Sequence, residues 1–113
     1  MTGLEANIVQ VLESRDHVSF AELRRIEGFS GGDDPHNIEL NENSNIYLWI
    51  NMSEAAAEII QQLISSKRFK FEPCSPLVYL TDGCTLSMPI MKKARKQFKK
   101  PHWLPVTISK KAS

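Results

Sequence analysis

Cysteine is scarce in this 113-residue chain, which contains only Cys74 and Cys84. Neither belongs to a CxxC or CxxH pair, so the sequence contains no disulfide framework and no typical zinc-ligand spacing. A zinc site that combined both cysteines with His102 would still lack a fourth ligand, and we expect no metal. We interpret both thiols as packing residues, and the scarcity of cysteine favours a reducing, cytoplasmic compartment.

Long apolar runs are also absent. No stretch of about 18 or more uncharged apolar residues occurs, which argues against a transmembrane helix. The first ten residues, MTGLEANIVQ, lack the basic and apolar regions of a signal peptide. With 42% apolar and 24% charged residues, the composition is ordinary for a globular domain. We therefore expect one soluble, cytoplasmic domain over residues 1–113, without a membrane partner.

A catalytic motif is missing as well. Asp16 and His17 are adjacent, and His36 follows two aspartates, but no serine, cysteine or threonine has partners at a spacing typical of a triad. The glycines at 31 and 32 are not followed by the GK[ST] ending of a phosphate-binding loop. We therefore expect neither an enzyme nor a bound cofactor.

Acidic residues are absent after Asp82, and this absence divides the chain into two parts of opposite charge. Residues 1–91 contain 6 basic and 13 acidic side chains, a net charge of −7. Residues 92–113 contain 8 basic side chains and no acid, a net charge of +8. Such an asymmetry predicts an interaction with nucleic acid or with an acidic protein. The alternative is that the basic end only neutralises the protein's own acidic surface.

Capping signals and apolar periodicity predict three helices before residue 67. A T-x-x-E box at Thr2 begins a helix over Gly3–Ser14, and an S-x-x-E box at Ser19 begins a short second helix that ends at Gly28. Ser53 caps a third helix, whose apolar residues fall within one arc. These residues are Ala56, Ile59, Ile60, Leu63 and Ile64.

Strand signals lie between and after these helices. Residues 29–37 are expected to form a loop, followed by two short strands around residues 42–44. Residues 68–72 alternate between apolar and polar side chains, and residues 77–81 form a second β run, so we predict a hairpin with its loop at 73–76. The residues expected in the core include Ile60, Leu63, Phe71 and Leu80.

The segment KKARKQFKKP, residues 92–101, places six bases within nine residues. On a helix over residues 88–100, these bases span an arc of about 160°. The sequence therefore predicts a basic amphipathic helix that ends before Pro101. The apolar stripe that docks it on the domain lies opposite the bases and comprises Ile90, Met91, Ala94 and Phe98.

An extended segment is predicted after this helix, over residues 102–108. Trp103 either packs against the domain or stacks, together with His102, on a nucleic-acid base. Burial is the rule for large aromatic side chains, which favours packing for Trp103. Residues 109–113 are expected to be a flexible tail.

The order helix, short capped helix, strand, long helix and hairpin, ending in YLTDG, resembles a winged-helix domain over residues 4–83. The resemblance implies that residues 53–66 are the recognition helix and residues 68–81 the wing. About 25 residues with a strand separate the second and third helices, where the family has a short turn. The resemblance implies DNA binding in most such domains, and RNA or protein binding in others.

The exposed face of the predicted recognition helix contains two carboxylates and no base, and phosphates would repel it. Gln61 and Gln62 on that face are candidates for reading bases. Phosphate contacts are then expected from the wing and the basic helix. The candidates are Lys67, Arg68, Lys70, Lys92, Lys93, Arg95, Lys96, Lys99, Lys100 and His102.

The sequence thus predicts an α+β, winged-helix-like domain with helices on a small antiparallel sheet, followed by the basic helix and extended segment at residues 84–108. We expect a nucleic-acid-binding regulatory or accessory protein, with DNA preferred to RNA as the partner. The alternative is a protein-interaction module with no nucleic-acid ligand. The sequence leaves a homodimer open.

Overall fold

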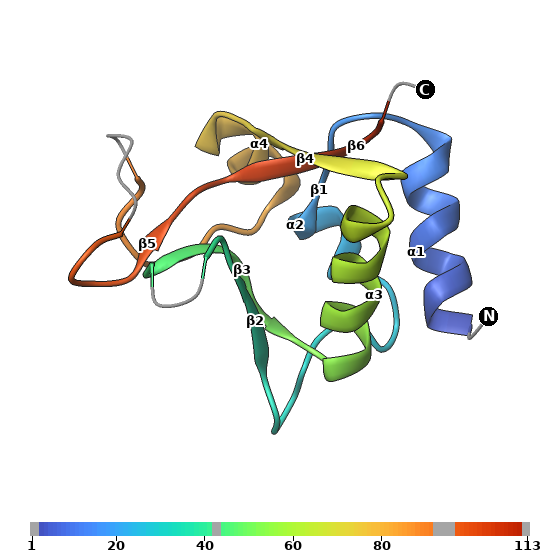
Figure 1. Ribbon diagram of the computed structural model, residues 1–113, viewed down its shortest axis with the longest axis horizontal. Coiled ribbons are helices and arrows are strands. Elements are labelled where there is room, and N and C mark those ends of the chain that lie inside the picture. The colour runs from blue at the N-terminus through green and yellow to red at the C-terminus, as the bar shows by residue number, and fades with distance from the viewer. Residues whose placement is uncertain (1–2, 42–43, 92–96, 112–113) are drawn as a thin grey trace.

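The computed structural model describes residues 3–41, 44–91 and 97–111. These residues form four helices and two three-stranded sheets, so the predicted α+β class is confirmed (Figure 1). Helices α1 (Gly3–Ser14) and α3 (Glu54–Ser65) lie at one end of the molecule (Figure 1). Strand β5 (His102–Trp103) lies at the opposite end.

The three predicted helices before residue 67 are present. Helix α1 has the predicted bounds, and Ser53 caps α3 by accepting a hydrogen bond from the Ala56 N–H at 3.1 Å. Helix α2 (Phe20–Leu23) begins at the predicted cap but is shorter than expected. Beyond it, the Ile26 N–H bonds to the carbonyl three residues earlier at 3.0 Å, so a tighter turn replaces the continuation toward Gly28.

One sheet contains the two strands predicted around residues 42–44. Strands β2 (His36–Glu39) and β3 (Ile46–Met52) pair antiparallel, with His36 opposite Met52. Strand β5 joins the other edge of β3 in parallel, with His102 opposite Ile46. The loop predicted to extend to residue 37 is therefore shorter than expected, because β2 begins at His36.

The second sheet is built around strand β6 (Val106–Lys110). Strands β1 (Val18–Ser19) and β4 (Phe69–Pro73) lie on its two sides, and both pair with it antiparallel. The predicted strand at residues 68–72 and the predicted extended segment at 102–108 are thus confirmed. The flexible tail is wrong for Ser109 and Lys110, because both belong to β6 and Ser109 is only 3% exposed.

The predicted wing is wrong, because residues 77–81 belong to helix α4 (Pro76–Asp82) and not to a strand. Ser75 caps this helix by accepting from the Leu77 N–H at 3.2 Å, a proline occupies its first turn, and Gly83 ends it at φ 85°. These start and stop signals outweigh the β propensity of the LVYLT run. The predicted burial of Leu80 is wrong for the same reason, since the side chain is 61% exposed on α4.

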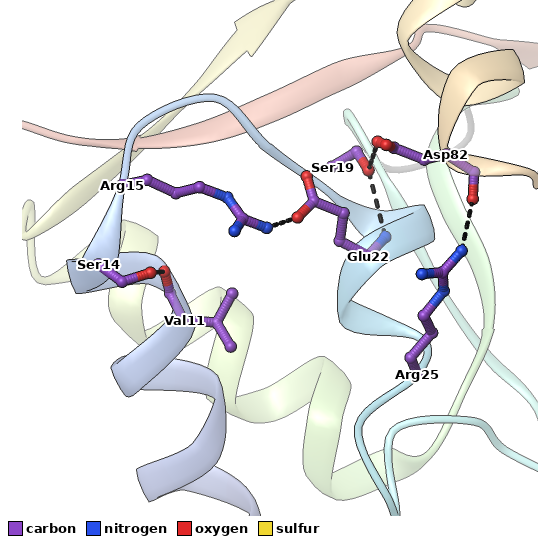
Figure 2. Close-up of polar contacts among 7 residues, drawn as sticks. All are labelled: Val11, Ser14, Arg15, Ser19, Glu22, Arg25 and Asp82. Carbon is purple, nitrogen blue, oxygen red and sulfur yellow. Dashed lines mark hydrogen bonds and ion pairs between the residues drawn. The ribbon is translucent and has the colours of Figure 1, made fainter.

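Side-chain contacts attach α4 to the chain around α2. The Ser19 hydroxyl donates to a carboxylate oxygen of Asp82 at 2.7 Å, and the Arg25 guanidinium donates to the Asp82 carbonyl at 3.0 Å (Figure 2). An ion pair between Arg15 and Glu22 joins the segment before β1 to α2 (Figure 2). The C-terminal end of α4 therefore lies against the N-terminal half of the chain.

The predicted basic helix over residues 88–100 is wrong at both ends. Ile90 forms a parallel bridge with Trp103, and residues 97–100 are not helical. The backbone of this region bonds to other parts of the chain instead of to its own preceding turn; the Phe98 N–H, for example, donates to the Ser44 carbonyl at 2.8 Å. Residues 92–96, with four of the six bases and Ala94, lie outside the described residues.

An aromatic cluster with rings from α2, β3, α4 and β5 lies within the core. Phe20 stacks on Trp49 with ring centroids 5.8 Å apart, and Trp49 stacks on Tyr79 at 5.5 Å. Trp103 meets Tyr79 edge to face at 4.9 Å and is 1% exposed, which confirms the packing interpretation for Trp103. Ile60 and Leu63 are also buried as predicted, and Phe71 packs against the cluster while half-buried.

Truncation of the buried Ile60 to alanine is expected to lower the free energy of unfolding by about 2–5 kcal/mol, because it leaves a cavity in the core. Leu80→Ala is the matched control, and removal of this exposed side chain should change stability by less than about 0.5 kcal/mol. Urea denaturation measures both. Equal losses in the two variants would contradict the assignment of faces on α3 and α4.

Candidate nucleic-acid interface

Six of the predicted phosphate-binding residues lie within the described part of the chain, and the structure separates them into two groups. One group, Lys67, Arg68 and Lys70, lies in the turn after α3 and at the start of β4. The other group, Lys99, Lys100 and His102, lies in and just before β5. Figure 1 shows the α3–β4 turn and β5 at opposite ends of the molecule. The two groups therefore do not form one continuous surface.

In the first group, Arg68 already has an acidic partner. Its guanidinium lies 3.0 Å from the Glu13 carboxylate of α1 and also packs over the Phe69 ring at 5.6 Å from the centroid. Lys67 and Lys70 are exposed, and Lys67 adopts a left-handed backbone conformation with φ 65°. This end of the molecule thus combines two exposed bases with a guanidinium whose charge Glu13 offsets.

The two glutamines proposed to read bases occupy different surroundings. Gln61 and Gln62 are both exposed on α3, but Gln62 also lines a pocket of about 220 Å³ between α1 and α3 together with Glu5 and Arg68. The Gln62 side of α3 therefore faces α1 across this pocket. The exposed face of α3 also contains the acids Glu54 and Glu58.

In the second group, Asn45 anchors the backbone around Lys99 and Lys100. Its side-chain amide donates to the Phe98 carbonyl at 2.9 Å, and its own carbonyl accepts from the His102 N–H at 2.7 Å. Asn45 has φ 59°, a conformation in which asparagine is enriched. The turn before β3 therefore holds the residues on both sides of the two lysines.

The chain just before the six bases, at residues 89–91, is attached as well. The Trp103 N–H donates to the Pro89 carbonyl, and the Met91 N–H donates to the Trp103 carbonyl, both at 2.8 Å. Residues 89–91 thus run beside β5, and Trp103 is itself buried in the core. The chain is thus attached at Met91 through Trp103, and at Phe98 through Ser44 and Asn45.

An aromatic pair lies where Phe98 is attached. The rings of Phe98 and His102 stack with centroids 4.0 Å apart and an angle of 23° between their planes. The His102 Nδ1 lies 2.8 Å from the Lys100 carbonyl, which can only accept, so Nδ1 carries the proton. Sequence reasoning predicts a role for His102 but not for Phe98 as its partner or Asn45 as the anchor; the available signal is an asparagine just before β3, a residue type enriched at positive φ.

One serine, histidine and glutamate come together elsewhere, beside β6. The Ser109 hydroxyl lies 3.5 Å from His17 Nδ1, and the Glu72 carboxylate lies 3.9 Å from that same nitrogen. A catalytic triad needs the serine and the acid on opposite ring nitrogens. This group therefore does not have the geometry of a nucleophilic site.

No protein-family model, curated protein sequence or solved structure matches this chain. The winged-helix resemblance therefore stays a prediction, and the hairpin that it identified as the wing is a strand followed by α4. None of the helices within residues 3–41, 44–91 and 97–111 has the length and apolar character needed to span a membrane.

Proposed function

We propose that the protein binds nucleic acid through its basic segment, defined as residues 92–102. The observation that carries this proposal is the attachment of the chain on both sides of the bases, through Met91 before them and through Phe98 and His102 at their end. Six basic side chains and no acid lie within this segment. Because phosphate contacts dominate nucleic-acid affinity, a cationic segment attached at both ends favours such a ligand.

The Phe98–His102 ring pair adds a second contact of the required kind. Proteins that bind single strands combine a cationic path for the backbone with aromatic rings on which bases stack. Lys99 and Lys100 are exposed next to the ring pair, and His102 is half-buried. We propose DNA as the first polymer to test and RNA in parallel, each in single-stranded and duplex form. In this proposal α3 makes no base contacts.

Titration of a labelled oligonucleotide over a range of salt concentrations tests the proposal. The parent protein should bind with a salt slope on the order of 4–6, if that many phosphates are neutralised. Lys99→Gln with Lys100→Gln should lower this slope by about two. The matched control is Lys67→Gln with Lys70→Gln, which removes two exposed bases at the opposite end and should leave binding unchanged.

Two outcomes would contradict the proposal. Absence of binding to all four polymers at low salt is the first. The second is a Lys99 and Lys100 double variant that binds as the parent does but unfolds at a lower temperature. In that case the basic segment neutralises the protein's own acidic surface.

Protein binding is the second candidate function, and one observation favours it. Leu77 and Leu80 are 67% and 61% exposed and lie one turn apart on α4. An exposed apolar pair of this kind is more typical of a protein contact than of a nucleic-acid contact. If the parent protein binds neither DNA nor RNA in the titration above, α4 is the surface to test for protein binding.

A further inference from the structure

A histidine and two carboxylates come together on the face formed by the start of β2 and the start of α3. The side chains are Asp34, His36 and Glu54, and one ligand atom from each lies within 4.8 Å of the other two. The hairpin register explains the convergence, because His36 pairs with Met52 across β2 and β3 and Glu54 follows two residues later. This group is independent of the basic segment.

The two pieces of chain that supply these side chains are tied together by backbone hydrogen bonds. The Gly31 N–H donates to the Asn51 carbonyl, and the Ser53 N–H donates to the Phe29 carbonyl, both at 2.8 Å. The backbones approach so closely that a Cβ atom on Gly31 would lie 2.5 Å from the Met52 carbonyl oxygen. The loop before His36 is therefore held against the residues that lead into Glu54.

The chemistry of the three groups matches a divalent transition-metal ion. Imidazole nitrogen and carboxylate oxygen bind Zn²⁺ at about 2.0–2.2 Å, which places two ligand atoms of one ion about 3–3.5 Å apart. His36 Nε2 and an Asp34 carboxylate oxygen are already 3.3 Å apart. Asp34 and Glu54 are exposed, where side chains can reorient toward a bound ion.

Charge also favours a cation at this place. Two carboxylates contribute two negative charges, against a partial charge of about +0.5 from the N-terminus of α3. The imidazole selects transition metals over Mg²⁺ and Ca²⁺, which prefer oxygen ligands alone. We propose that Asp34, His36 and Glu54 bind a divalent transition-metal ion of the Zn²⁺ class, with water in the remaining coordination positions.

Calorimetric titration of the full chain with Zn²⁺ alone tests this proposal. The parent should bind one ion at this site with a dissociation constant in the micromolar range, and Mg²⁺ should not compete. Asp34→Asn, His36→Gln and Glu54→Gln should each weaken binding by about tenfold or more, because each removes one of three ligands. The Zn²⁺-dependent rise in the unfolding temperature should disappear in the same three variants.

Two matched controls separate the site from general attraction of cations. Asp33→Asn removes a neighbouring carboxylate that does not belong to the group, and it should bind as the parent does. His17→Gln removes a histidine 3.9 Å from the Glu72 carboxylate, a pair that no third ligand joins among the described residues, and it should also be neutral.

The cysteines need a separate test, because Zn²⁺ also binds thiolates. Co²⁺ should give a spectrum without a thiolate charge-transfer band, and Cys74→Ser with Cys84→Ser should retain binding. The proposal is overturned if the parent shows no saturable binding, if the three ligand variants bind as the parent does, or if binding is lost with the two thiols.

Discussion

Tyr79→Phe is expected to lower the free energy of unfolding by about 2–6 kcal/mol. The Tyr79 hydroxyl donates to the Val106 carbonyl at 2.6 Å and accepts from the Phe20 N–H at 3.1 Å, and all three groups are buried. Phenylalanine fills the same space but leaves both backbone groups without a partner. Each such group costs about 1–3 kcal/mol. Chemical denaturation of the two proteins at neutral pH measures the difference.

The same substitution should change how stability depends on pH. Burial raises the pKa of Tyr79 above its ordinary value of 10. Above pH 10 the unfolded chain therefore loses this proton while the folded chain keeps it. The contribution of Tyr79 to the free energy of unfolding is fully present below pH 10. At higher pH it declines by about 1.4 kcal/mol per pH unit, until the raised pKa of the folded state is reached. Tyr79→Phe should remove this decline.

Tyr47→Phe is the control for the alkaline measurement, because Tyr47 is only half-buried in β3. This variant should retain the decline that the parent shows above pH 10. Burial also raises the pKa of the Cys74 thiol, so the comparison is best repeated with Cys74→Ser as the background. An unchanged alkaline slope in Tyr79→Phe would contradict the raised pKa of Tyr79, because the phenol would then contribute nothing to the decline.

Trp103→Ala is expected to lower the free energy of unfolding by about 3–5 kcal/mol, the range for removal of a buried large aromatic ring. The indole packs against Trp49 and Tyr79, with ring centroids 6.4 Å and 4.9 Å away. Its backbone also holds residues 89–91 beside β5. The variant should therefore lose nucleic-acid affinity together with stability, because the attachment of the basic segment depends on this strand.

Trp103→Phe is a milder companion variant. The indole N–H of Trp103 is buried and has no hydrogen-bond partner among the described residues, so its removal leaves no new unpaired group. Phenylalanine is smaller than tryptophan but keeps an aromatic ring, and the expected loss is about 1–2 kcal/mol, within the usual range for one substitution. A smaller loss in the alanine variant than in the phenylalanine variant would contradict the packing described for Trp103.

Local signals predicted a large part of the fold. The bounds of α1 and the caps of α2 and α3 follow from residues within one turn of each helix, as at Ser19 and Ser53. Helix α4 has equally complete signals in Ser75 and Gly83, but the β propensity of the apolar run between them predicts a strand. This prediction is wrong because the caps at both ends outweigh that propensity.

The parts of the candidate interface that were missed depend on partners distant in the sequence. Phe98 bonds to Ser44 and Asn45, more than 50 residues earlier, and no periodicity within residues 88–100 reveals this. The group of Asp34, His36 and Glu54 likewise depends on the register of β2 and β3. Composition predicts the charge of the basic segment, whereas the contacts that attach it to the domain are visible only in the tertiary structure.

The central place of β6 has a consequence for the rate of folding. Strands β1 and β4 do not pair with each other, and each of them pairs with β6 alone. Val18 pairs with Ile108, 90 residues away, and Phe69 pairs with Lys110, 41 residues away. Closure of loops of this length is entropically costly and slows folding. Helix α3 and the β2–β3 hairpin can form from neighbouring residues, so the search that brings residues 106–110 between β1 and β4 should limit the rate.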